Sequence, residues 1–461
     1  MAPVKKKSAQ QDNRGAVLIV SMIFVLIFSA LAVSMATMSG TNVQLASNQH
    51  KVGSAIASTE SGLEAMRYWL NRVEFPSSTL PSDYFGTIVG TLQSDLSANS
   101  ITNITIYNNG TIPPVPLDSA SGQAFEGEIL IDANNSDILQ LSATGGNDIT
   151  RTIRVQYDIQ PYEYPIFDFG MATKGPVHFL GNPTVNGVNS NSEADIFIES
   201  SNNNLAMLVT GNCNFDGNIS VANSIANVAL MGAVQIAGDT GQTAIDNHIN
   251  IGADPPQFPV PDTQHFQQYA TGPVIDSSTD LSSPGMTITN ATIAAGTDPN
   301  FLGNVIIEGI LYIEQPNIVT FQENVDSRGM IVAEGDPNFT GANNSISFLG
   351  NFVTNPVPAG VQFDAIRQEE GSSILAPAFS IDFAGNFSAL SGVMAVSGAH
   401  FSGNVNATIE GTILNYSDNP TVIEGNARLN FDRSDNITVP AGFDTHRILK
   451  YKPASYEEIP Q

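Results

Sequence analysis

Residues 14–36 read RGAVLIVSMIFVLIFSALAVSMA, and this stretch decides how the rest of the chain is interpreted. The sequence has no Asp, Glu, Lys or Arg between Arg14 and Lys51, and it is almost wholly apolar from Ala16 to Ala36. At a rise of about 1.5 Å per residue, an apolar run of this length crosses a hydrocarbon core of about 30 Å. We therefore predict a helix that spans a membrane once.

The charges that flank this run predict its orientation. Lys5, Lys6, Lys7 and Arg14 precede it, whereas residues 37–49 carry no charge. The positive-inside rule then keeps the N-terminus in the cytoplasm, so that the helix is a single-pass inner-membrane anchor with a periplasmic or extracellular body. One alternative is a cleaved secretory signal peptide, whose apolar core is normally shorter, at about 7–15 residues. Another is a plain anchor with no further role.

Charge and composition exclude several classes of protein. The 461 residues include 17 basic and 44 acidic ones, for a net charge of −27, and almost all of the negative charge follows residue 75. A nucleic-acid partner is not expected, because phosphate binding needs a concentrated basic surface. The single cysteine, Cys213, allows neither an internal disulfide nor a Cys-based zinc site. No catalytic or nucleotide-binding motif is present, so we expect no enzyme activity, cofactor or metal.

Beyond the apolar run, a second pattern predicts that the helix continues as an amphipathic stem. Apolar residues recur at alternating spacings of three and four, which is typical of a narrow apolar seam on one helix face. Pro76 is expected to end the helix, which we place at residues 16–75. The seam could pack on the chain's own globular head, on neighbouring subunits, or on both. Its members are Val52, Ile56, Leu63, Met66 and Leu70.

The N-terminal region resembles a known family. The Lys-rich leader, Arg14-Gly15, the run AVLIVSMIFVLIFSALAVSM and the segment ASTESGLEAMRYWL are similar to the N-terminal domain of PilX-type pilus assembly proteins, which are minor members of the type IV pilin and pseudopilin group. The resemblance covers about residues 10–75. It implies cleavage after Gly15 by a prepilin peptidase, which would make Ala16 the first mature residue. Val20 stands where most pilins carry a glutamate, which fits a minor subunit better than a repeated major one.

The segment that follows, residues 77–165, is predicted to be a small α+β region. Apolar and polar residues alternate over Ile101–Tyr107, Glu126–Ile131 and Arg151–Ile159, which favours half-buried antiparallel strands. Clusters of Ser, Asn, Gly and Pro separate these strands and indicate turns.

An internal repeat, Phe-x-Gly-Asn, organises the body. Spacings of 18, 35 and 36 residues between its phenylalanines fit one and two units of a short repeat. Units of this size predict a mostly-β parallel β-helix, or β-solenoid, over 166–450, in which each unit stacks on the next. We expect Phe to point inward, Gly to supply a positive φ at a corner, and Asn to form turns and ladders. The residues are Phe179, Asn182, Phe215, Asn218, Phe301, Asn304, Phe348, Asn351, Phe383, Asn386, Phe401 and Asn404.

Two segments are not expected to follow the repeat. Residues 253–285 are rich in proline, with Pro255-Pro256, Pro259, Pro261 and Pro273, and are predicted to be an insertion, and residues 451–461 are predicted to be a C-terminal tail. The alternative for the whole body is a β-sandwich with Gly/Asn hairpins.

Together these patterns predict a membrane-anchored pilin-like protein, a minor pilin or pseudopilin, for type IV pilus assembly or surface display. Its acidic solenoid would serve adhesion or interaction. The expected partners are the membrane, other pilin-like subunits, the pilus or secretion machinery, and a polysaccharide or protein on a surface. Two alternatives remain: a membrane-anchored β-helix enzyme that acts on polysaccharide, and a cell-envelope scaffold outside any filament. The enzyme would need several carboxylates and a Lys or Arg converging on one face.

Overall fold

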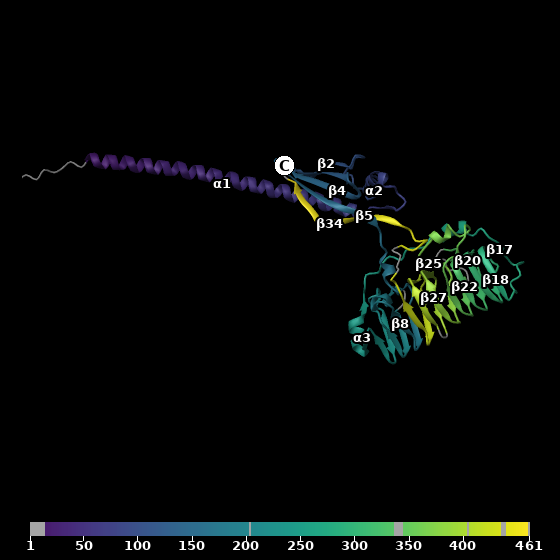
Figure 1. Cartoon of the computed structure of the whole chain (residues 1–461). Coiled ribbons are helices and arrows are strands. Elements are labelled where there is room, and N and C mark those ends of the chain that lie inside the picture. The colour runs from purple at the N-terminus through teal and green to yellow at the C-terminus, as the bar shows by residue number, and fades with distance from the viewer. Residues whose placement is uncertain (1–13, 202–203, 336–343, 403–404, 435–438, 460–461) are drawn as a thin grey trace, which may run out of the picture. The chain divides into compact units, whose positions relative to one another are not determined.

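The chain divides into two compact units. The computed structural model describes residues 14–201, 204–335, 344–402, 405–434 and 439–459 (Figure 1). The first unit contains the residues up to Tyr162 together with those from His446 onward, and we call it the helix-head unit. The second unit, Glu163–Thr445, is the body. The body is thus inserted between two segments of the helix-head unit.

A single helix, α1 (Arg14–Leu70), opens the helix-head unit and runs through Gly40 and Gly53 without a break. The helix ends at Leu70, before residue 75, which was the end predicted from the sequence. Arg72 N donates to Trp69 O and Val73 N to Leu70 O, so the last turn tightens and the chain leaves the helix. Residues Glu74–Pro76 form the short strand β1, which pairs with a strand near the C-terminus.

The head is one six-stranded antiparallel sheet in the order β1-β34-β5-β4-β3-β2. Alternate residues of its long strands are buried, so one face is apolar and packs against α1 and α2. The predicted strands at 126–131 and 151–159 are present within β3 and β5. The elements are η1 (Pro81–Asp83), α2 (Tyr84–Ala98), β2 (Thr111–Asp118), β3 (Gln123–Asp132), β4 (Asn135–Gly146), β5 (Thr150–Pro161) and β34 (His446–Ile459).

Two predictions for this unit are wrong. Ile101–Tyr107 is not a strand. Ile106 is buried, and its carbonyl accepts a hydrogen bond from Gln93 Nε2 at 2.7 Å instead of one from a neighbouring strand. Residues 451–459 are not a tail but the second half of β34, which pairs with β5. The strand is held there because the side chain of Leu449 is buried in the head core.

The body contains two sheets, and its strand pairings are parallel apart from β14 with β15. The nine-stranded sheet has the order β13-β10-β7-β32-β29-β26-β23-β21-β19. Its strands are β7 (Val177–Gly181), β10 (Leu205–Gly211), β13 (Asn227–Met231), β19 (Asn300–Phe301), β21 (Ile318–Phe321), β23 (Ser345–Phe348), β26 (Ser380–Phe383), β29 (Ala399–Phe401) and β32 (Thr421–Gly425).

The second sheet of the body has nineteen strands, and the described residues of the body also form five short helices. Its strands are β6 (Met171–Thr173), β8 (Thr184–Gly187), β9 (Ile196–Ile198), β11 (Cys213–Phe215), β12 (Ile219–Val221), β14 (Val234–Ile236), β15 (Asp239–Thr240), β16 (Ile249–Ile251), β17 (Val274–Ile275), β18 (Gly285–Ile293), β20 (Asn304–Ile313), β22 (Val325–Ala333), β24 (Phe352–Thr354), β25 (Ser372–Ala376), β27 (Phe387–Ser391), β28 (Val393–Val396), β30 (Asn406–Glu410), β31 (Ile413–Asn415) and β33 (Arg428–Phe431). The helices are η2 (Pro165–Asp168), η3 (Asn191–Ala194), α3 (Gly241–His248), η4 (Gln264–Tyr269) and η5 (Ile366–Gln368).

The strand order reveals the path of the chain. From β7 the chain moves through β10 to β13 at one edge of the nine-stranded sheet. It restarts at β19 on the opposite edge and returns strand by strand to β32, which pairs with β7 in the register Ile423↔Phe179. Residues 253–285, predicted as an insertion, connect the two edges. Figure 1 shows α3 at one end of the body and β17 and β18 at the other.

Four of the six repeat phenylalanines form a buried row together with Phe321, while the other two, Phe179 and Phe215, are buried and contact each other with ring centroids 4.7 Å apart. Parallel register places Phe301, Phe321, Phe348, Phe383 and Phe401 on successive strands. Their ring centroids lie 4.7, 5.2, 5.1 and 5.3 Å apart, with interplanar angles of 11° or less. Aromatic pairs at such distances add about 0.5–1.5 kcal/mol each beyond the area that they bury. The row therefore ties successive strands to one another.

The glycines of the repeat are needed mainly because the main chain of a neighbouring unit lies close to them, and less because of their own φ angles. A positive φ was predicted for them, but among those described only Gly181 has one, at 108°. A Cβ on Gly350 would instead collide with the backbone of Glu323, and one on Gly385 with the backbone of Gly350. Glycine is required at these corners because adjacent strand-turn units touch there through their main chains.

The repeat asparagines link neighbouring units. Asn324 Nδ2 donates to Asn304 Oδ1 at 3.0 Å, and Asn351 N donates to Asn324 Oδ1 at 3.2 Å. Asn182 Nδ2 makes the equivalent bond to Asn426 Oδ1 at 3.0 Å. Other members differ. Asn218 Oδ1 faces His248 Nδ1 at 2.9 Å, Asn386 offers its main-chain carbonyl to Phe352 N, and Asn404 lies outside the described residues.

Candidate functional site: the N-terminal helix

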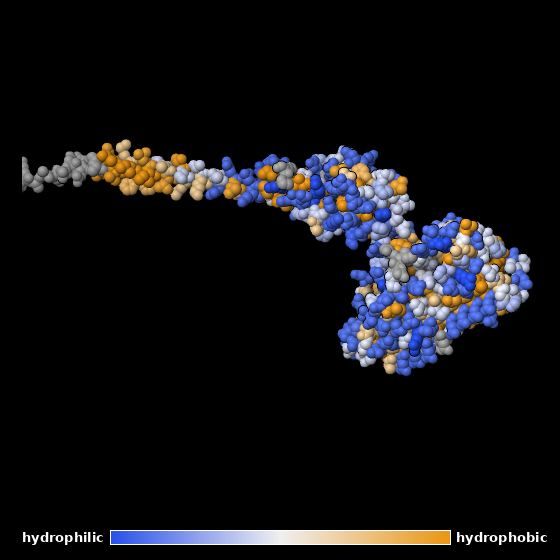
Figure 2. Space-filling view, in the orientation of Figure 1, coloured by the Kyte–Doolittle hydropathy of each residue, from blue (hydrophilic) through white to orange (hydrophobic). Residues whose placement is uncertain are grey.

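The first half of α1 is exposed, and its residues from Val17 to Ala36 form an almost wholly apolar surface. Every residue from Val17 to His50 is exposed (Figure 2). This is the single described helix that is long and apolar enough to cross a membrane, judged by length and composition. Soluble proteins rarely leave an apolar patch of more than a few hundred Å² in water. The surface therefore needs lipid or other apolar helices around it, and the helix is a candidate single-pass membrane anchor.

Three hydroxyl side chains in this half bond back to their own helix. Ser21 Oγ donates to Leu18 O at 2.9 Å, Thr37 Oγ1 to Val33 O at 2.7 Å, and Thr41 Oγ1 to Thr37 O at 3.0 Å. Each bond pairs the hydroxyl proton, which is costly to leave unsatisfied in hydrocarbon. These three hydroxyls are thus compatible with an apolar surrounding.

The second half of α1 packs on the head sheet of its own unit. Leu63, Met66 and Leu70 of the predicted seam are buried in the head core, while Val52 and Ile56 are half-buried. The helix contacts β3, β4 and β5. The seam therefore faces the chain's own head, which leaves the exposed first half as the surface available to other molecules.

An ion pair marks the change from one half to the other. Lys51 is the first charged residue after the apolar run, and its Nζ lies 2.6 Å from Asp148 Oδ2. The hydrogen bond from Lys51 lowers the pKa of the Asp148 carboxyl. Both groups are exposed, so the pair adds little stability. It does place charge on both the helix and the head where α1 begins to pack on the sheet.

Small residues allow α1 and the head sheet to lie close together. A Cβ on Gly145 would collide with the backbone of Ser58 and Thr59, and one on Gly62 would collide with the ring of Phe125. Thr59 Oγ1 lies within hydrogen-bond distance of two carbonyls, at 2.8 Å from Ala55 O in the helix and 2.9 Å from Arg151 O in the sheet. The head thus fixes the direction in which the apolar half projects. Sequence reasoning missed these contacts, although the pair Gly145-Gly146 within an alternating strand is a signal for close approach.

The predicted processing residues lie at the start of the helix. Arg14 opens α1, and Gly15 and Ala16 belong to its first turn. Val20 is exposed with the rest of the apolar surface. The leader charges Lys5, Lys6 and Lys7 lie outside the described residues.

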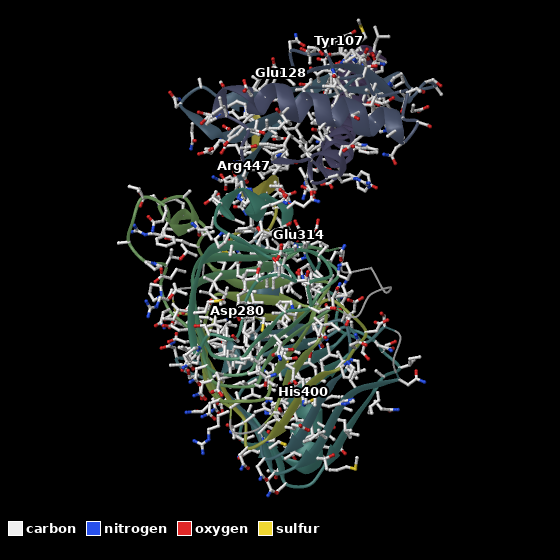
Figure 3. The ribbon with its side chains drawn as sticks, turned by 90° about the vertical axis from the view of Figure 1, so that its right-hand side faces the viewer. Tyr107, Glu128, Asp280, Glu314, His400 and Arg447 are labelled. Atoms are coloured by element: carbon white, nitrogen blue, oxygen red, sulfur yellow. The ribbon has the colours of Figure 1, made fainter. Side chains whose placement is uncertain are left out.

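Charged clusters in the body are internally paired. Arg433 lies near Asp168, Glu193 and Asp195, but Glu193 accepts hydrogen bonds from backbone N–H groups and Asp195 accepts one from Asn218 N. His400, labelled in Figure 3, lies between Asp382 and Glu424 at 3.2 and 3.1 Å. Among the described residues, no group of three or more His, Cys, Asp or Glu side chains is arranged to hold a metal ion. The clusters therefore have a structural explanation.

The one cysteine is buried in the body core. Burial raises the pKa of the Cys213 thiol to about 11. At neutral pH the thiol is thus protonated and a poor nucleophile.

Comparisons with known proteins bear mainly on the helix. The family model described as PilX N-terminal matches residues 14–64, which covers the exposed half of α1 and most of the half that packs on the head. No curated protein matches the chain. A solved structure, the competence-associated pilin ComZ from Thermus thermophilus, matches at 10% identity over 89% of this chain and 97% of that chain, with a TM-score of 0.23. A TM-score this low carries no argument about the fold.

Proposed function

We propose that this chain is a membrane-anchored, pilin-like protein, a minor pilin or pseudopilin, that acts in type IV pilus assembly or surface display. One observation carries the proposal: α1 is a continuous helix whose first half is apolar and exposed and whose second half packs on its own head. The PilX N-terminal match over residues 14–64 supports the same assignment. In this proposal the exposed half lies in the bilayer or among the helices of other pilin-like subunits.

The proposal includes orientation and processing. The N-terminus lies in the cytoplasm, because Lys5, Lys6, Lys7 and Arg14 precede the apolar run. The pilus or secretion machinery then handles a chain cut between Gly15 and Ala16. The head and body lie on the far side of the inner membrane, in the periplasm or outside the cell.

The body is proposed to be a β-solenoid that presents an acidic surface. Parallel register from strand to strand, the row of stacked phenylalanines and the bonds between asparagines of neighbouring units support this. Its role would be adhesion to, or interaction with, a polysaccharide or protein, without catalysis. The paired state of the described carboxylates and arginines supports a binding role over an enzymatic one.

The proposal predicts that charge in the apolar run removes the chain from the membrane. Val25 is 64% exposed near the middle of the run, and Phe28 lies one turn further along. An arginine at the centre of a membrane helix costs about 2.5–3.5 kcal/mol on insertion scales. Val25→Arg with Phe28→Arg is therefore expected to lower the carbonate-resistant membrane fraction of the chain by at least about tenfold.

The matched control places the same charges on the body. Val361, which is 89% exposed, and Leu349 lie there, so Val361→Arg with Leu349→Arg should leave the membrane fraction unchanged. Equal membrane fractions for the two double variants would refute the anchoring role of α1.

A further inference from the structure

In the part of the chain that the structure describes, the free side of β13, at one edge of the nine-stranded sheet, carries none of the usual protection of a sheet edge. In the sheet order β13 is terminal and pairs with β10 alone. Proteins usually block such edges with proline, charge, a bulge or a covering segment, because unpaired N–H and C=O groups recruit other strands. β13 reads NVALM, with neither proline nor charge.

The other edges show the usual protection. β2, the edge strand of the head, carries Pro113, Pro114 and Pro116. At the α3 end of the body, β15 pairs antiparallel with β14, and α3 contacts β14 and β16 (Figure 1). At the opposite end, Leu302 N donates to Leu281 O and Asn304 N to Pro284 O, so the segment around residues 281–284 lies against that edge.

The sequence around β13 is also free of charge. Residues 217–238 contain no Asp, Glu, Lys, Arg or His, in a chain with a net charge of −27. Ile225 is 75% exposed beside the strand, and Met231 at its end is 53% exposed. Two copies of so acidic a chain repel each other over most of their surface, since like charges oppose association. The uncharged β13 segment lets two copies approach at a lower electrostatic cost than the acidic remainder of the chain.

The direction of the backbone groups shows how a second copy would bind. Asn227 N donates to Asn204 O, on the β10 side. Because successive residues of a strand alternate, Val228 and Leu230 direct their N–H and C=O groups to the free side. Their side chains pack against the body core, which leaves the side chains of Ala229 and Met231 facing outward.

From this geometry we propose that the β13 edge is a self-association surface, on which β13 of a second copy pairs antiparallel about a two-fold axis at Ala229. An antiparallel edge is complementary to itself under such an axis. Val228 of one copy then exchanges two N–H···O=C bonds with Leu230 of the other. Ala229 lies opposite Ala229 of the second copy as a non-hydrogen-bonded pair, with Cα atoms about 4.5 Å apart. This pairing uses no residue of α1 and does not depend on the role proposed for the helix.

That arrangement is tested by cysteine cross-linking in the full chain, purified in detergent. Cα atoms about 4.5 Å apart fall within the range that a disulfide allows. The variant Ala229→Cys, oxidised with diamide at low protein concentration, is expected to give at least about fivefold more disulfide-linked dimer on a non-reducing gel than Thr210→Cys. Thr210 also faces outward and is more exposed than the half-buried Ala229, but it lies on β10, one strand inside the edge. The native thiol of Cys213 is buried and serves both variants as the same background.

A charge variant distinguishes edge pairing from chance collision. Adding Met231→Lys to Ala229→Cys should reduce the dimer severalfold, because an edge lysine resists strand pairing. Adding Leu349→Lys, on an inner strand end, should not. Equal cross-linking of Ala229→Cys and Thr210→Cys, absence of dimer from both, or insensitivity to Met231→Lys would each overturn the proposal. Both cysteine variants carry the same α1, so cross-linking that arises from association through the helix appears in the Thr210→Cys control as well.

Discussion

Replacing Phe348 by alanine is expected to lower the free energy of unfolding of the body by about 3–5 kcal/mol, the usual range for a buried phenylalanine. The side chain is 1% exposed and lies at the middle of the phenylalanine row. Its ring stacks on Phe321 on one side and on Phe383 on the other, and it also contacts Phe352 at 4.5 Å. Truncation therefore opens a cavity that faces three rings at once, and the strands on both sides lose a contact.

The single tryptophan allows this effect to be assigned to the body. Trp69 belongs to the helix-head unit, so its fluorescence in a urea titration reports that unit, while the reaction of the single buried thiol, Cys213, with a thiol reagent reports the unfolding of the body. Phe348→Ala should shift the midpoint of thiol exposure and leave the fluorescence midpoint in place. Leu349→Ala, at the exposed neighbouring position, should shift neither by more than about 0.5 kcal/mol. A shift of that small size for Phe348→Ala would show that the row does not hold the body together.

Excising the body is expected to leave a folded helix-head unit. Tyr162 and His446 border the insertion, and Tyr162 N donates to His446 O at 2.8 Å. β5 and β34 are antiparallel neighbours in the register Pro161↔Arg447. A two-residue Asn-Gly turn can therefore join Tyr162 to His446 as a hairpin. We expect the chain without residues 163–445 to remain in the membrane fraction and to unfold cooperatively by Trp69 fluorescence.

A longer excision provides the control. Removing residues 150–445 with the same turn also removes β5, which pairs with both β4 and β34. That chain should lose the fluorescence transition, because the sheet under α1 is split. If the shorter excision also abolished the transition, the head would depend on the body, and the two-unit description of the chain would be wrong.

Local patterns in the sequence were sufficient to predict the helix and two of the three strands expected in the head. The uncharged run from Ala16 to Ala36 and the alternation over 151–159 correspond to features of α1 and β5, because both depend on neighbouring residues only. β2 escaped notice because Pro113, Pro114 and Pro116 are unfavourable in a strand, and they are tolerated here at the sheet edge. The residues beyond Lys450 were predicted to be a tail, and their strand was missed because its partner, β5, is distant in sequence.

The body shows the same limit on a larger scale. Its Phe-x-Gly-Asn motifs indicate repeating units, but their spacing cannot show that the chain starts in the middle of the sheet and closes β32 on β7. Phe321 lies in the aromatic row without the motif, since only register places it there. Glycine roles were also misjudged, because a collision such as that at Gly385 depends on the neighbouring unit.

The identity of the first residue of the mature chain tests the central claim most directly. The chain is isolated from the membrane fraction of the cells that make it, and its N-terminal peptide is identified by mass spectrometry. The account predicts a peptide that begins at Ala16, with the apolar half of α1 intact. A chain that retains Met1 would contradict pilin-like processing. A chain that begins beyond Ala36, or that is recovered free of the membrane, would contradict the anchoring helix itself.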